Sequence, residues 1–192
     1  MLFRSGVAPK MIIAKGRGNV DNWGVYHASA NASPATGFLY LNGTQAFTVT
    51  STQWNNTAPT STVFSIGTDT RINQSTIGFV AYCFAEIAGF SKFSSYTGNG
   101  STDGPFVYLG FRPKYILIKR SSAAGDNWNI MDSSRNTYNI TNLELDANST
   151  SVEQTGTSTT MAYMDFLSNG FKMRTTSAGG NASGSKIGRA HV

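Results

Sequence analysis

The sequence has little charge, almost no cysteine and no long hydrophobic run. Charged residues make up 13% of the 192 residues, about half of the roughly 25% usual for soluble domains. Cys83 is the only cysteine, so no disulfide can form within the chain, and we expect a small buried side chain rather than a nucleophile. No apolar run approaches the ~18 residues of a membrane span, and Met1–Ser5 leads into no apolar signal segment. These shortages predict no membrane insertion.

Positive charge is in excess but not concentrated. The formal net charge is +5. Lysines and arginines are scattered singly, and only Lys119 and Arg120 are adjacent. A surface that follows a phosphate backbone would cluster these residues. We therefore expect no nucleic-acid partner.

Both ends resemble translated sequencing adapter. The last six residues, 187–192, are encoded by ATC GGA AGA GCA CAC GTC, and Leu2–Ser5 by CTC TTC CGA TCT. Each match is in register with a start or a stop in the adapter. We predict that residues 1–5 and 187–192 derive from adapter, and source reads lacking adapter bases at either end would refute this. Such segments are set aside before the fold is considered.

An internal repeat organises the remaining residues. Pro9–Lys15 returns as Pro113–Lys119, 104 residues later. The other correspondences are Gly6 with Gly110, Asn22-Trp23 with Asn127-Trp128, Leu39–Asn42 with Leu143–Asp146, and Phe64–Gly67 with Phe166–Gly170. Because they occur in the same order, they predict two copies of one module.

The units of both copies are short apolar or alternating runs, separated by Gly, Asn, Ser and Pro, as expected for strands. The predicted strands are Met11–Lys15, Trp23–His27, Gly37–Leu41, Thr62–Ile66, Ile77–Phe84, Tyr115–Arg120, Trp128–Met131, Leu143–Asp146, Met161–Leu167 and Phe171–Thr175. The pattern predicts an all-β fold of tandem β-sandwich, jelly-roll-like modules. Both modules are expected to be incomplete. Residues 6–86 would be the C-terminal part of the first, and 87–186 the second without its last strand. We expect 187–192 to pack poorly at the edge left open.

Three side-chain expectations follow from the repeat. Lys15 and Lys119 close equivalent strands and are expected to face solvent at a sheet end. Trp23 and Trp128 are expected to fill the sandwich core, because a Trp buries a large area and needs one partner for its N–H. The glycines of Gly16–Gly18 lack the rest of a phosphate-loop motif and predict a hairpin loop.

The sequence resembles a family of tail-fibre and tail-appendage modules of tailed bacteriophages. The matching stretches are Phe84–Glu86, Gly89–Phe93, Tyr96–Gly100, Gly104–Pro113, Asn127-Trp128 and Phe166–Lys172. The resemblance covers essentially residues 6–185. It implies a structural protein of the virion tail, made in the host cytoplasm, with other tail proteins as partners and a homo-oligomer, often a trimer, as the assembled form. The family supplies no catalytic residue to transfer.

No constellation of catalytic or metal-binding residues is evident in the sequence. One cysteine and two histidines cannot form a clustered zinc site, and the spacing of Asp126, Asp132 and Asp146 matches no calcium loop. The carboxylates available for glycoside hydrolysis include Asp21, Asp69, Glu86, Asp103 and Asp165, and nothing in the sequence selects a pair. We therefore predict no enzyme activity, no metal and no cofactor.

The predicted function is a structural and adhesive module of a phage tail fibre or appendage that contacts host-surface glycan. Trp54, in a polar loop without counterpart in the second copy, is the candidate to stack on a sugar; the alternative is that it caps the sandwich. Two other functions stay open: a polysaccharide-degrading enzyme of the tail-spike type, and a bacterial surface carbohydrate-binding module. Two carboxyl groups roughly 5–10 Å apart across a groove would favour the enzyme.

Overall fold

The computed structural model is built of short antiparallel strands. It describes residues 6–161 and 163–191, with only the backbone for 189–191. The first copy of the repeat contains β1 (Met11–Gly16), β2 (Gly24–His27), the 3-10 turn η1 (Pro34–Thr36), β3 (Gly37–Tyr40), β4 (Thr48–Val49) and β5 (Phe79–Phe84). The second contains β6 (Lys92–Thr97), β7 (Phe106–Tyr108), β8 (Tyr115–Arg120), β9 (Asn129–Asp132), β10 (Leu143–Asp146), β11 (Gln154–Thr155), β12 (Met164–Leu167), β13 (Gly170–Met173), the one-turn helix α1 (Ala178–Asn181) and β14 (Lys186–His191).

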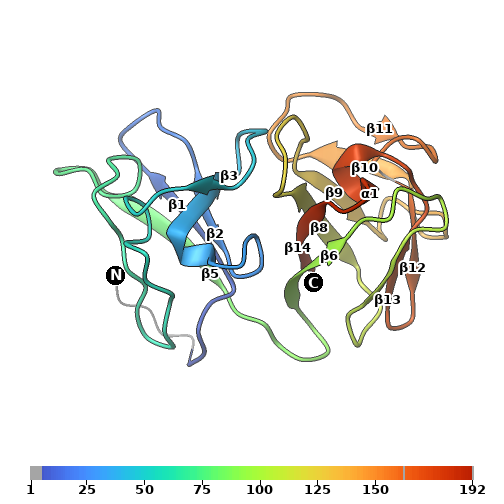
Figure 1. The fold of residues 1–192 in the computed structure, drawn as a ribbon, viewed down its shortest axis with the longest axis horizontal. Helices are drawn as coiled ribbons and strands as arrows, with labels where there is room; N and C mark the ends of the chain where they lie inside the picture. Colours follow the sequence, from blue (N-terminus) through green and yellow to red (C-terminus); the bar gives the residue numbers. More distant parts are fainter. Residues whose placement is uncertain (1–5, 162, 192) are drawn as a thin grey trace.

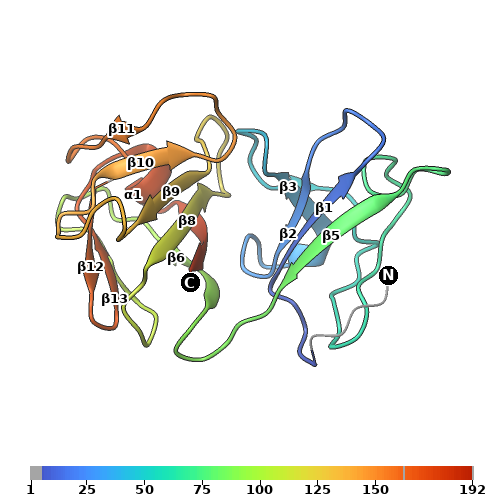
Figure 2. The same cartoon turned by 180° about the vertical axis from the view of Figure 1, so that it is seen from behind.

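The strands form three antiparallel sheets. The N-sheet has the order β4-β3-β2-β1-β5, the C-sheet β11-β10-β9-β8-β14-β6, and the small sheet β12-β13-β7. The N-sheet lies in one lobe and the other two sheets in the second lobe, and the chain passes between the lobes from β5 to β6 (Figures 1 and 2). The predicted all-β, sandwich-like fold is confirmed. Among the described residues, no helix is long and apolar enough to cross a membrane.

Equivalent strands occupy equivalent places in the two larger sheets. In the N-sheet, β1 lies between β2 and β5; in the C-sheet, β8 lies between β9 and β14. A hydrogen-bonded clasp is also repeated. The Trp23 N–H donates to Asn42 Oδ1 (2.9 Å) and the Trp128 N–H to Asn148 Oδ1 (2.7 Å). Each of these asparagines also donates from Nδ2 to the Asn that precedes the Trp. The repeat predicted from the sequence is therefore a structural repeat.

One predicted correspondence is out of register by two residues. The strand pairing places Leu39 opposite Val25 and Leu145 opposite Ile130. Leu39 therefore corresponds to Leu145 rather than to Leu143. The offset grows from 104 at the first strand to 106 at the third, because loops of the second copy contain extra residues. This register decides which side chains of the two modules occupy the same position.

The sheets and loops stack in four layers with three apolar cores. The first core lies between the 50–76 loop and the N-sheet and includes Ile12, Tyr26 and Trp54. The third lies between the C-sheet and the small sheet and includes Ile116, Met131 and Phe171. The middle core joins the two lobes. All four residues of β2 and of β3 are buried, because apolar layers cover both faces of the N-sheet.

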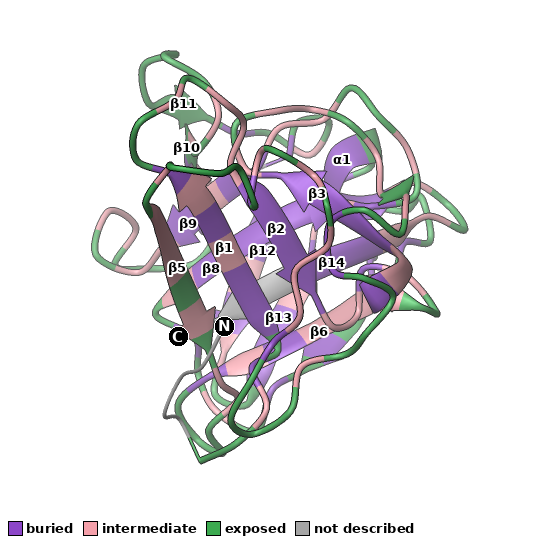
Figure 3. Ribbon diagram, turned by 90° about the vertical axis from the view of Figure 1, so that its left-hand side faces the viewer, coloured by how far each residue is buried: buried purple, intermediate pink, exposed green. Residues whose placement is uncertain are grey.

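The middle core is shared by the two copies. It combines Met11, Val25 and Leu39 of the N-sheet with Leu117 and Trp128 of the C-sheet. In Figure 3, viewed along the long axis, the strands of the two sheets overlap and are largely buried. Equivalent faces of the N-sheet and the C-sheet pack against each other, so the two copies lie face to face. The two lobes therefore share one core and are not independent modules.

Trp128 is the largest side chain in this shared core. Its side chain is 3% exposed, and its Nε1–H donates to the Tyr40 carbonyl of the first copy (2.7 Å). Further cross-copy bonds run from Phe47 N–H to Ser121 O (2.9 Å) and from Ser121 Oγ to Ala30 O (2.8 Å). The expectation that each Trp fills the sandwich core is met by Trp128. Trp23, its counterpart, is only half-buried.

Two structural expectations for the C-terminal segment are wrong: that the second module lacks its last strand, and that the residues after 186 pack poorly. β14 pairs with β8 on one side and with β6 on the other. Ile187 is fully buried. Residues 187–191 thus occupy the position of the last strand, which the second module was expected to lack, because two neighbouring strands offer free backbone groups there. Residues 1–5 and Val192 lie outside the described residues, and an adapter origin of either end stays a prediction.

The predicted strand Thr62–Ile66 is also wrong. Residues 50–76 instead form a loop that packs on the N-sheet, in which Phe64 is buried. This loop covers the outer face of the N-sheet, and the small sheet covers the outer face of the C-sheet. Arg17 and Gly18 begin the hairpin loop between β1 and β2, as the sequence predicts, whereas Gly16 is the last residue of β1.

We predict that Trp128→Ala lowers the free energy of unfolding of the whole chain by about 3–5 kcal/mol, because a large buried side chain is removed and a cavity is left. Trp23→Ala is the matched control and should cost less than half as much, because Trp23 is half-buried. Urea unfolding followed by circular dichroism measures both. Equal costs for the two variants would contradict a shared core centred on Trp128.

Candidate functional site

The first copy offers no ligand site at Trp54. This side chain is 1% exposed. Its ring packs edge-on against Tyr26 (6.0 Å between centroids) and Phe64 (6.3 Å). A sugar cannot reach a face of the indole, so the prediction that Trp54 binds a ligand is wrong. The alternative, packing within the sandwich, is what the structure has, because the polar loop around Trp54 folds down onto the N-sheet.

A polar cavity of about 350 Å³ lies at the edge of the C-sheet. One wall consists of Asn127, Asn129, Glu144, Asp146 and Gln154, and we call it the carboxylate–amide groove. Asn129 lies on β9, Glu144 and Asp146 on β10, and Gln154 on β11. The other lining residues are Gly125, Asp126, Thr155, Gly156, Thr159, Thr160, Met161, Ser177 and Gly179. This volume is in the range of small-molecule sites.

Amide side chains hold the two carboxylates of the groove. Asn129 Nδ2 donates to both Glu144 Oε1 and Asp146 Oδ1 (3.0 Å to the latter). Asp146 Oδ2 also accepts from Asn127 Nδ2 (2.7 Å) and Gln154 Nε2 (3.4 Å). Asn129 and Glu144 are themselves buried. Because its polar side chains are fixed by one another, the groove presents a preformed set of acceptors and donors.

Comparison of the two copies in the observed register shows what is specific to this groove. Strand pairing makes Glu144 the counterpart of Phe38 and Asp146 the counterpart of Tyr40. In the first copy those aromatic rings lie 4.5 Å apart and belong to the core that contains Trp54. At these two positions the sheet face is therefore apolar and covered in the first copy but polar and open to the cavity in the second.

The position of Asn129 also differs between the two copies. Its counterpart is Gly24, where an added Cβ would lie 3.0 Å from Gln53 Oε1 and 3.1 Å from Ile72 Cγ2. The 50–76 loop thus leaves no room for a side chain in the first copy. The second copy lacks that loop over the same face, so an Asn fits and can bridge two carboxylates.

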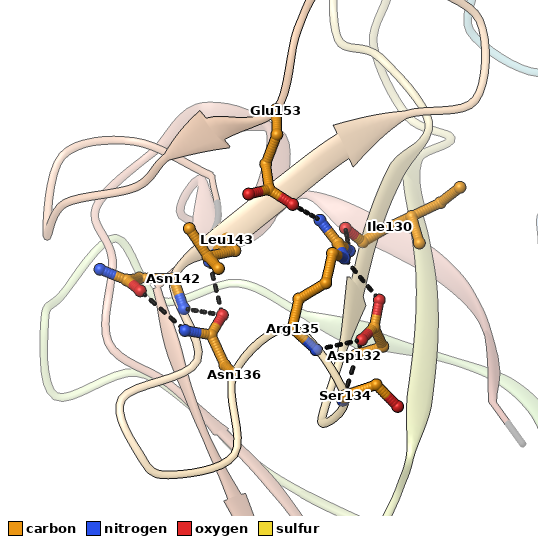
Figure 4. A network of polar contacts seen from close by, with 8 residues as sticks. All are labelled: Ile130, Asp132, Ser134, Arg135, Asn136, Asn142, Leu143 and Glu153. Atoms are coloured by element: carbon orange, nitrogen blue, oxygen red, sulfur yellow. Dashed lines mark hydrogen bonds and ion pairs between the residues drawn. The ribbon is translucent and has the colours of Figure 1, made fainter.

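A second polar network braces the strands that form the groove wall (Figure 4). Asp132, at the end of β9, accepts from the Ser134 and Arg135 backbone N–H groups and pairs with Arg135 Nε (2.6 Å). Arg135 also donates to Ile130 O and pairs with Glu153. Burial raises the pKa of Asp132, but the hydrogen bonds from Arg135 and Ser134 outweigh it and hold this pKa below its ordinary value. The hairpin between β9 and β10 is fixed as a result.

Asn136 completes this brace in Figure 4. Its Oδ1 accepts from the Asn142 N–H (3.0 Å) and the Leu143 N–H (2.7 Å), where β10 begins. Its Nδ2 donates to Asn142 Oδ1 (3.1 Å). The position of Glu144, one residue further on, is therefore set by the loop before it.

Lys119 is buried, so the expectation that it faces solvent at a sheet end is wrong. Its side chain is 1% exposed, and Nζ donates to Asp126 O (2.8 Å) and Thr44 O (3.1 Å). One of these carbonyls, Thr44 O, belongs to the other copy. Lys15, the counterpart of Lys119, is half-buried and donates to Gly16 O and Asn19 O. Burial lowers the pKa of Lys119 to about 8; Asp126 opposes this shift and Arg120 adds to it.

Of the carboxylates named from the sequence, Asp103 and Asp165 are brought together by Arg174, with which both form ion pairs. Four of them are ion-paired: Asp69 with Arg71, Glu86 with Lys92, Asp103 with Lys172, and Asp165 with Arg174. Asp21 accepts from Asn19. Of the three calcium candidates, Asp126 and Asp146 line the groove, whereas Asp132 belongs to the brace. Within the described part of the chain no three His, Cys, Asp or Glu side chains gather as metal ligands would.

Two further features, Cys83 and a depression lined by Tyr108, were also considered as sites of chemistry or binding. Cys83 is half-buried against the first core, and burial raises the pKa of its thiol, which disfavours the nucleophilic thiolate. Tyr108 lines a separate depression together with Phe111 and the paired Glu86 and Lys92. This depression offers an aromatic ring, but most of its charge is already paired.

Comparison with known proteins gives a family without an assigned role. A family model described as "Domain of unknown function (DUF7483)" matches residues 3–187. No curated protein and no solved structure matches the chain.

We predict that Lys119→Met removes a pH dependence of stability. Because the pKa of Lys119 is about 8 in the folded chain and 10.5 ordinarily, the unfolded chain binds more protons between those values. The stability of the wild-type chain should therefore rise relative to the variant between about pH 8 and 10.5, by up to ~3 kcal/mol. Urea unfolding at several pH values measures it. Parallel curves for the two proteins would contradict the burial of this amine, since both carry the same tyrosines.

Proposed function

The chain belongs to the DUF7483 family, and because that description assigns no role, we propose one from the site and the sequence: a structural and adhesive module of a bacteriophage tail fibre or tail appendage that contacts host-surface glycan. The location in the virion tail, the tail-protein partners and the homo-oligomer rest on the sequence resemblance. The glycan rests on the carboxylate–amide groove.

The observation that carries the glycan proposal is the exchange of Phe38 and Tyr40 for Glu144 and Asp146 on the same sheet face. Sugars present many hydroxyl groups, which donate to carboxylates and accept from amides. The groove offers both kinds of partner in a fixed arrangement, and Thr159 and Ser177, which also line it, add hydroxyls. Among the described residues no aromatic ring lines it, so hydrogen bonds rather than stacking would carry the binding.

Weak binding at one site is compatible with adhesion. Each hydrogen bond contributes about 0.5–1.5 kcal/mol net, so a small polar site binds weakly by itself. Several copies on one appendage raise the overall affinity without any new contact. A repeated module in a homo-oligomer would supply such copies.

The arrangement of the carboxylates does not favour the enzyme alternative. Glu144 and Asp146 alternate on one strand and share the donor Asn129. Asp126, the third carboxylate that lines the groove, is ion-paired with Arg120. A glycosidase instead places its two carboxyl groups on either side of the bond to be cut. The groove thus supports binding better than hydrolysis. A bacterial surface carbohydrate-binding module would use the same chemistry in another setting.

We predict that Gln154→Ala weakens binding to an array of bacterial capsular and lipopolysaccharide glycans by about 2- to 12-fold, as expected for one hydrogen bond. Gln154 is exposed on β11, so its removal leaves the buried amide–carboxylate contacts of Asn129 in place. Thr48→Ala, at the equivalent position of the first copy, is the matched control and should bind like the wild type.

A third variant tests whether the glycan binds elsewhere, and a second measurement tests for hydrolysis. Tyr108→Ala removes the aromatic ring of the separate depression. Loss of binding in Tyr108→Ala alone would assign the glycan to that depression and overturn the groove proposal. Release of reducing ends from a bound glycan, abolished by Glu144→Gln, would replace adhesion by hydrolysis.

A further inference from the structure

The outer edge of β5 differs from the same edge of its counterpart. The pairing of β5 with β1 and of β14 with β8 makes Phe79 equivalent to Ile187 and Cys83 to His191. β14 is paired on its other side with β6 over six residues. β5 ends its sheet, and among the described residues no strand pairs with its outer side. One edge is covered and the equivalent edge is open.

The hydrogen-bonding pattern shows which groups of β5 are free to bond outward. Arg17 N–H donates to Gly78 O (2.8 Å), in register with the ladder between β1 and β5. Because alternate residues of an antiparallel strand bond to the same neighbour, Val80 and Tyr82 bond toward β1. The N–H and C=O groups of Ala81 and Cys83 then point away from the sheet.

The same analysis of β14 shows what such groups bind in the second copy. Gly98 N–H donates to Ser185 O (3.0 Å) and sets the register between β6 and β14. By the same alternation, the backbone groups of residues 187, 189 and 191 face β6. These are the equivalents of residues 79, 81 and 83, so the fold already contains the strand that fits this edge.

The side chains along the open edge are apolar and exposed. Tyr82 is 48% exposed and Phe84 41% exposed, and β5 is less buried than its neighbours β1 and β2 (Figure 3). In the pairing of β14 with β6, Ala190 is opposite Phe93. A strand with the β6 pattern would therefore place an aromatic residue beside Tyr82, a favourable cross-strand pair. A long edge with exposed aromatics is a template for a further strand.

We propose that the outer edge of β5 is a strand-acceptor site for a strand of the β6 type, supplied by a neighbouring module of the same family. The incoming segment runs antiparallel to β5, bonds to the backbone of Phe79, Ala81 and Cys83, and covers Tyr82. Main-chain bonds give the affinity and the aromatic residue gives the register. The site does not depend on the glycan proposal.

A peptide of residues 90–99, acetylated and amidated, tests the site on the full chain. We expect saturable binding in fluorescence anisotropy. Amide exchange at residues 79, 81 and 83 should be fast in the free chain and at least tenfold slower with the peptide, while residues 80 and 82 stay protected throughout. Peptide Ser94→Pro, which replaces the residue opposite position 81, should not bind. Chain variant Ala81→Pro should not bind either, and the control Ala81→Ser, which keeps the N–H, should bind.

Three outcomes would overturn the proposal. Equal binding of the native and Ser94→Pro peptides, a test that leaves the chain unaltered, would exclude strand pairing. Binding that leaves residues 79, 81 and 83 unprotected and speeds exchange at residues 94 and 96 of the chain would mean that the peptide displaces β6. Protection of residues 79, 81 and 83 in the concentrated chain without peptide, with a doubled mass by ultracentrifugation, would assign the edge to a second copy.

Discussion

The apolar core between the N-sheet and the C-sheet is the constraint on which the rest of the structure depends. It buries Trp128 and Leu39 from opposite sides and fixes the two copies face to face. Each copy leaves one sheet face apolar, and neither could expose it to water at low cost. The outer faces are thereby free to differ. The first copy covers its outer face with a loop and the second with a small sheet, and a polar groove remains beside that sheet.

Local sequence patterns predict most of the strands but not what the strands pack against. Alternation and turn residues place β8 and β10 at their observed bounds, because each strand must present one apolar face wherever it lies. The same patterns mislead at Lys119 and Trp54, which are polar or lie among polar neighbours yet are buried. Their burial is caused by segments far away in the chain, the other copy for Lys119 and the folded-down loop for Trp54.

The groove was missed for a related reason. Leu39–Asn42 and Leu143–Asp146 look alike in sequence, and this likeness hides the two-residue shift. Aligning Asn42 with Asn148, the residues of the repeated clasp, would have set Phe38 against Glu144 and Tyr40 against Asp146. A change from aromatic to carboxylate at paired core positions is a signal that a core has been converted into a polar site. The signal was present in the sequence, but only the hydrogen bonds fix the register that reveals it.

We expect the two copies to unfold as one cooperative unit, because they share the core between their sheets. Differential scanning calorimetry of the full chain tests this most directly, because the ratio of calorimetric to van't Hoff enthalpy reports how many units unfold independently. A ratio near one, with a single transition, is the result that a shared core predicts. A ratio near two, or two resolved transitions, would contradict it and would restore two separate modules joined by a linker.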